Sequence, residues 1–167
     1  MKVRTLGALG VVLVMAGACL GQLDPGKLRL NGVGLGSTYG QVKKALGKPS
    51  SESKPRKEEC SGGRERAVDY AGAHFWFLDG SGNDRKTFSV VSFDVTSPKY
   101  SVSGIKVGDS QLTVRRILGS KFTSETNDEE GTTRWVYGIG DEDGPGWTNI
   151  KFRKGKVVSI SSSYTVC

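Results

Sequence analysis

The feature that most constrains the fold of this chain is a phrase that occurs twice. GVGLGSTYGQVKKALGKP, residues 32–49, matches GIKVGDSQLTVRRILGSK, residues 104–121, at Gly32, Gly36 and Gly47 and at the apolar positions Val33, Leu35, Val42 and Leu46. Self-similarity at a period of about 72 residues indicates two copies of one structural unit. We expect the first copy in residues 22–97 and the second in residues 98–167.

Each phrase has the sequence of a short, capped helix. Thr38 is followed three residues later by Gln41, the spacing of a capping box, and Ser110 occupies the same place in the second copy. Gly47 and Gly119 follow the helical segment, where a left-handed residue closes a helix. Apolar residues at i, i+3 and i+4 predict one buried stripe in each copy. The stripes are Val42, Ala45 and Leu46, and Val114, Ile117 and Leu118.

Three strands are expected after each helix, beyond polar loops at 50–63 and 123–133. They are 66–68, 75–77 and 90–93 in the first copy, and 134–136, 150–152 and 157–160 in the second. Alternation places Val91, Phe93 and Val95 on one face, as it does Val158 and Ile160. The predicted fold class is α+β, with two tandem repeats, each a short helix packed on a three-stranded antiparallel β-meander. The two sheets could lie side by side or pack face to face.

The first residues have the pattern of a signal peptide over 1–21. Lys2 and Arg4 precede an apolar run that is too short to span a bilayer, and small residues then lead to Cys19. Ala16 and Ala18 suit an ordinary signal peptidase, but the same residues also resemble a lipobox, in which Cys19 would be lipidated. The prediction is an exported protein that is periplasmic, anchored to the outer membrane or secreted.

Cys60 and Cys167 are the two cysteines besides Cys19. Two remaining cysteines usually pair in an oxidising compartment, and this bridge would close a loop of roughly 100 residues, with a stabilisation of ~4–5 kcal/mol. The alternative is a pair of free thiols.

The charge balance is moderately basic, with 24 Lys and Arg against 17 Asp and Glu. This balance is compatible with anionic partners such as lipid headgroups. Basic residues do not cluster with aromatic ones in any compact run, so nucleic acid is not an expected partner.

The spacing of glycine, helix and strands resembles the SmpA/OmlA family of bacterial outer-membrane lipoproteins, which have the BamE-like fold. The tandem arrangement resembles the β-lactamase inhibitory proteins. Lys121 departs from the pattern, because it stands where the first copy has Pro49. The resemblance implies a binding protein of the cell envelope and no enzyme. The residues that carry it are Gly36, Val42, Leu46, Gly47 and Pro49, echoed by Gly108, Val114, Leu118 and Gly119.

Catalytic, metal and cofactor sites are not expected. His74 is the one histidine of the chain, and a triad would need it as its base. Strand alternation instead makes it a sheet residue beside Trp76. No His/Cys cluster has the spacing of a metal site.

The open face of the predicted sheet is the best candidate for a binding site, because large exposed aromatic residues dominate interface energetics. If the two sheets covered each other, these rings would instead be core. A second candidate is the polar side of the two helices, which could meet anionic lipid or an acidic partner. The partner-binding candidates are His74, Trp76, Trp135, Tyr137 and Lys151. The basic helix residues are Lys43, Lys44, Arg115 and Arg116.

The leading hypothesis is therefore an exported, non-enzymatic module of the bacterial envelope that recognises another protein through an aromatic sheet face. One alternative is a structural lipoprotein of the outer membrane, anchored through Cys19. Another is a secreted inhibitor of a hydrolase, such as a β-lactamase or a protease, which would insert a loop such as Ser81–Asp84.

Overall fold

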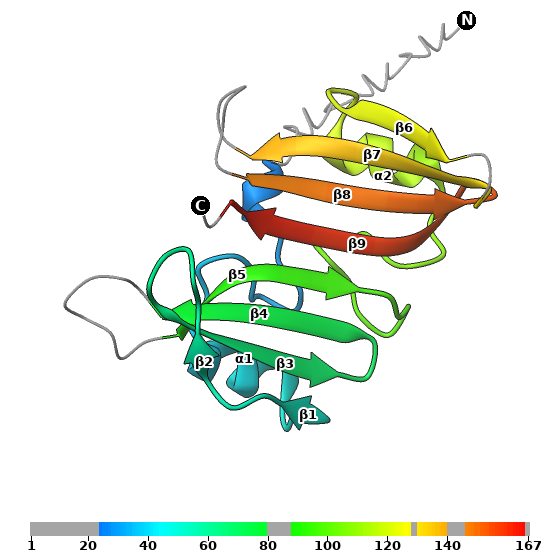
Figure 1. The fold of residues 1–167 in the computed structure, drawn as a ribbon. Helices are drawn as coiled ribbons and strands as arrows, with labels where there is room; N and C mark the ends of the chain where they lie inside the picture. Colours follow the sequence, from blue (N-terminus) through cyan, green and yellow to red (C-terminus); the bar gives the residue numbers. More distant parts are fainter. Residues whose placement is uncertain (1–23, 80–87, 128–129, 140–145, 166–167) are drawn as a thin grey trace, which may run out of the picture.

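The computed structural model describes residues 24–79, 88–127, 130–139 and 146–165. In these ranges, nine strands form one antiparallel sheet in the order β1-β3-β4-β5-β9-β8-β7-β6, and β2 also pairs with β3 (Figure 1). The strands are β1 Ser51–Glu52, β2 Arg56–Lys57, β3 Arg64–Tyr70, β4 Ala73–Asp79, β5 Phe88–Val95, β6 Thr123–Asn127, β7 Thr132–Ile139, β8 Gly146–Arg153 and β9 Lys156–Tyr164. The helices are the 3-10 turn η1 Pro25–Lys27, α1 Tyr39–Leu46 and α2 Gln111–Leu118.

Both helices have the caps that the duplicated phrase predicts. The side chain of Thr38 accepts a hydrogen bond from the backbone N–H of Gln41 in a complete capping box, and the side chain of Ser110 accepts one from the N–H of Thr113. Gly47 and Gly119 close the helices, each at φ 82°. The predicted apolar stripe is wrong at Ala45, which is exposed.

One face of the sheet carries the core. Strand pairing aligns Phe75 with Phe93, then Ser162, Thr148 and Tyr137 in one row across five strands. All five side chains are buried. The row runs through both halves of the sheet, so the two helices cover the same face (Figure 1).

The predicted fold class is wrong. Two tandem repeats, each with its own three-stranded meander, were expected, but nine strands form one sheet in which β5 and β9 pair, with Ser92 opposite Ser163 and Val95 opposite Ile160. If the two halves were separate, these strands would be edges with unpaired N–H and C=O groups, and joining them satisfies both.

Two further expectations about strands are also wrong. The segments expected as polar loops contribute β1, β2 and β6. Bulges in the β4–β5 and β8–β9 pairings shift the alternation, so Val90 and Val157 are buried in place of Val91 and Val158. A bulge adds one residue to a strand and thereby reverses the faces of the residues beyond it.

The opening segment ties the halves together beneath the sheet. The backbone of Arg29 accepts a hydrogen bond from the N–H of Ser103 at 2.8 Å, and its own N–H donates to the Ser103 hydroxyl at 2.9 Å. Leu30 and Val102, both fully buried, form an isolated bridge. The turn η1 lies against β7 and β8. The predicted boundary at residues 97 and 98 falls between β5 and α2, but a division into two domains stays a prediction.

Candidate functional site

The face of the sheet opposite the helices brings together side chains from four central strands. We call this set the central face. It consists of two rows across β4, β5, β9 and β8. The first row is Trp76, Ser92, Ser163 and Trp147, and the second is His74, Asp94, Ser161 and Asn149.

Large side chains stand at the ends of the first row and small ones lie between them. Neighbouring strands are about 4.8 Å apart, so the strands of Trp76 and Trp147 are separated by roughly 14 Å. Ser92 and Ser163 lie between the two indoles. All four residues are partly or fully exposed. A partner could therefore contact Ser92 and Ser163 between the two aromatic rings.

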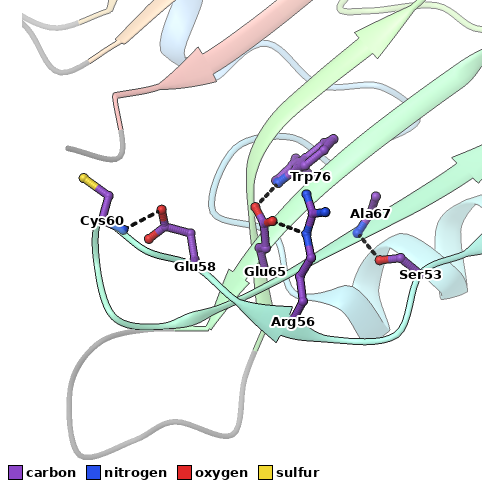
Figure 2. Close-up of polar contacts among 7 residues, drawn as sticks. All are labelled: Ser53, Arg56, Glu58, Cys60, Glu65, Ala67 and Trp76. Carbon is purple, nitrogen blue, oxygen red and sulfur yellow. Dashed lines mark hydrogen bonds and ion pairs between the residues drawn. The ribbon is translucent and has the colours of Figure 1, made fainter.

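Trp76 is fixed in place by polar contacts at the edge of the sheet (Figure 2). Its Nε1 donates a hydrogen bond to Oε2 of Glu65 at 2.9 Å. The other carboxylate oxygen of Glu65 pairs with Nε of Arg56, which comes from β2. Ser53 binds the N–H of Ala67 beside them at 2.9 Å. The short edge segments that were expected as a loop thus orient the indole.

His74 is oriented by a carboxylate on the neighbouring strand. Its Nδ1 lies 2.6 Å from Oδ1 of Asp69, and its ring centroid lies 5.3 Å from that of Trp76. Hydrogen bonds from His74 and then Ser51 lower the pKa of Asp69, because they favour its charged form. His74 and Trp76 were predicted to lie on this face, and the strand pairing puts them there.

Asp94 lies across the strand pair from His74, at the centre of the sheet. Partial burial raises the pKa of its carboxyl group, since removal from water disfavours the charged form, while His74 and the Val95 N–H act in the opposite direction. The alternation that turns Phe93 and Val95 inward turns Asp94 outward, but Asp94 was not among the predicted site residues.

Trp147 is the residue that sequence reasoning missed. Its side chain is 42% exposed, whereas Thr148 beside it is fully buried. The signal was available, because the alternation that turns Ile150 and Phe152 inward also turns Trp147 and Asn149 outward. The predicted strand began too late to include Trp147.

The assignment of Trp135 and Tyr137 to the open face is wrong. Both belong to the core, with 4% and 1% of their surface exposed. Trp135 stacks on Phe122 at 4.1 Å between ring centroids, and the Tyr137 hydroxyl donates to the carbonyl of Gly119 at 3.2 Å. Burial raises the pKa of Tyr137 to about 12.

The cause of this error is that strand 66–68 was matched with strand 134–136, which is one residue out of register. Tyr70 donates to the carbonyl of Gly47 at 3.4 Å, which is the contact that Tyr137 makes with Gly119, so Tyr70 corresponds to Tyr137. Val68 then corresponds to Trp135, and both are buried. A shift of one residue moves every side chain of a strand to the other face.

Lys151 lies on the open face, and its amino group is bound to a carboxylate of the same chain. Its Nζ donates to Oε2 of Glu130 at 2.7 Å, and this bond lowers the pKa of Glu130. Next to it, Arg134 pairs with Glu125. These residues and Thr132 line a pocket of about 330 Å³ beside the central face.

The basic helix residues lie on the opposite side of the molecule. Lys43 sits 5.1 Å from the ring centroid of Tyr39, and Arg115 sits 5.3 Å from that of Trp135. Lys44 and Arg116 are exposed. The structure therefore does not unite the two predicted surfaces into one site, and a role for the helix face stays a prediction.

Several predictions involve residues outside the described ranges. These include the signal peptide, lipidation of Cys19, the bridge from Cys60 to Cys167, and the loop Ser81–Asp84. Within the described ranges, no three His, Cys, Asp or Glu side chains are grouped so that they could hold a metal ion. No helix there is long and apolar enough to span a membrane.

Comparisons with known proteins leave the chain without an assigned family. No family model matches it, and no curated protein does. Among solved structures, it is similar to an extracellular protein containing a SCP domain from Bacillus anthracis str. Ames, with a TM-score of 0.43 and 13% sequence identity. The match covers 78% of this chain and 44% of that one, so this chain spans less than half of that protein's length. A similarity this low supports neither a fold nor a function.

Proposed function

We propose that this chain is an exported, non-enzymatic binding module of the bacterial cell envelope, which recognises a protein partner through the central face of its sheet. The observation that carries the proposal is the pair of tryptophans on the uncovered face, with Trp147 42% exposed and Trp76 partly exposed. An exposed Trp pair is costly to leave in water and is typical of interface hot spots.

The open side of the sheet extends beyond the central face on both sides. Its six long strands, β3, β4, β5, β9, β8 and β7, span about 24 Å at about 4.8 Å spacing and are roughly 20 Å long. This area of about 500 Å² would supply most of the ~800 Å² that each partner contributes to a standard interface.

The face is also held ready for binding. Trp76 is fixed by Glu65 and Arg56, and His74 by Asp69. Side chains that are already ordered lose less conformational entropy on association. The resemblance to BamE-like lipoproteins fits an envelope role and stays a prediction.

Site-specific photo-crosslinking in producing cells tests the proposal. A photoreactive amino acid at Asn149 should yield an adduct of discrete mass with a protein. The matched control carries the photoreactive amino acid in place of Leu112, which lies on α2 and is 77% exposed. This control should yield no adduct. The double variant Trp76→Ala and Trp147→Ala should lose the adduct while keeping its melting temperature. Equal adducts from both positions, or an adduct that persists in the double variant, would refute the proposal.

A further inference from the structure

Asp94 occupies the middle of the central face, and no lysine or arginine of the described part of the chain acts on it. Among the described residues, the polar groups that act on its carboxylate are the N–H of Val95 and the ring of His74. The strand on its other side, β9, offers Ser161 directly opposite. A partly buried carboxylate is normally satisfied by a charged or hydrogen-bonding partner.

The other carboxylates on this face have such partners. Glu65 pairs with Arg56, and Asp69 with His74. At the far end, Glu125 pairs with Arg134. Asp94 therefore differs from them, although it is the most central of the four.

No cation of the described sheet is placed to reach Asp94. Lys151 lies on β8, which is two strands from the β5 strand of Asp94, or about 10 Å at about 4.8 Å per strand. Along β8 it is two residues beyond Asn149, the residue in the same row as Asp94. Its amino group is bound to Glu130. The charge of Asp94 is thus left for a group from outside this part of the chain.

We propose, resting on the proposed function, that the central face takes up an arginine side chain of the partner protein, with its guanidinium on Asp94. The residues beside Asp94 include Ser92 and Ser161, whose side chains are small and whose hydroxyls accept hydrogen bonds. The indole of Trp76 lies diagonally across the β4–β5 pair from Asp94, and a guanidinium stacks well on an indole face.

Arginine fits this surface better than lysine does. A planar guanidinium forms two parallel hydrogen bonds with a carboxylate and is more weakly hydrated than an ammonium group, so it loses less on leaving water. His74 opposite Asp94 is held by Asp69 and so does not close over the carboxylate.

A double-mutant cycle on selected peptides tests the inference. A displayed library of random peptides is selected against the wild-type chain and counter-selected against the Trp76→Ala, Trp147→Ala variant. We expect the recovered peptides to share an arginine. In the best of them, arginine is replaced by citrulline, which has the same shape and no charge.

The expected result is non-additive. Asp94→Asn and the citrulline change should each weaken binding at least tenfold, and the two together should weaken it little further, because they remove one contact. Glu59→Gln is the matched control, since it removes an exposed carboxylate elsewhere, and it should bind as wild type does. Melting curves of Asp94→Asn establish that it folds.

The outcomes separate this inference from the proposed function. Peptides that depend on the tryptophans but share no arginine, or losses that simply add, overturn the arginine contact and leave the protein-binding face standing. A selection that returns no tryptophan-dependent peptide, or a face that instead binds envelope polysaccharide, overturns both.

Discussion

The indole Nε1 of Trp76 donates a 2.9 Å hydrogen bond to Oε2 of Glu65, which joins the most prominent ring of β4 to the carboxylate of β3 that also pairs with Arg56. The ring is partly exposed, and this bond sets its direction on the sheet. The orientation of Trp76 thus depends on Glu65 of β3 and, through Arg56, on β2, which was expected to be part of a loop.

Glu65→Leu should release the Trp76 ring. The indole proton then loses its acceptor, so we expect its NMR resonance to shift upfield and its exchange with water to quicken. Because the bond lies near the surface, the free energy of unfolding should change by less than about 1 kcal/mol. Glu65→Gln retains an acceptor oxygen and is the control. An unchanged indole resonance in Glu65→Leu would contradict the assignment.

Trp135→Ala and Trp147→Ala should differ sharply in stability. Trp135 is buried against Phe122, so its truncation should lower the free energy of unfolding by about 3–5 kcal/mol. Trp147 is 42% exposed, and its truncation should cost less than about 1 kcal/mol. Urea denaturation of both variants measures the difference. Similar losses would mean that the two faces of the sheet are assigned wrongly.

Asp94→Asn should stabilise the protein at neutral pH. Burial raises the folded-state pKa of Asp94, so its contribution to stability is present at low pH and is lost as pH rises through that pKa. Removing the charge should raise the melting temperature at pH 7 by about 1–3 °C. The gain should vanish near pH 3, where the protonated Asp94 of the wild type is as neutral as the asparagine of the variant. A lower melting temperature at pH 7 would show that Asp94 already has a cationic partner.

Asp69→Asn should have the opposite effect. Its folded-state pKa is lowered by hydrogen bonds, so its contribution is present above the unfolded pKa of about 3.9 and is lost as pH falls below it. Because the Asp69 side chain is 45% exposed, we expect a loss of only about 0.5 kcal/mol at pH 7. The loss should shrink between about pH 4 and pH 2. Thermal melts across this range test the sign, and a gap that widens on acidification would count against it.

The predicted bridge between Cys60 and Cys167 can be tested directly. The intact mass measured without reductant should be lower than the reduced mass by two hydrogens, and peptide mapping should recover the two cysteines linked. Reduction should lower the free energy of unfolding by about 4–5 kcal/mol on the chain-entropy model. Two alkylated thiols in the untreated protein would rule the bridge out.

Local chemistry alone determined the two capped helices. Thr38 and Ser110 bind N–H groups three residues away, and Gly47 and Gly119 supply the backbone freedom that ends each helix. These contacts lie within one or two turns, so the order of residues is enough to specify them. Simple alternation likewise placed His74 and Trp76 on the open face of β4, because that strand contains no extra residue before them.

Only the tertiary structure decided which residues share the open face across strands. The bulges beside Val91 and Val158 depend on how neighbouring strands pair, and the pairing of β5 with β9 joins segments that are far apart in the chain. A sheet has a period of two, so one residue of register changes a side chain from contact surface to core. Register is set by hydrogen bonds and packing between strands, and for that reason alternation could turn Trp147 and Asp94 outward but could not show that they share one surface with Trp76.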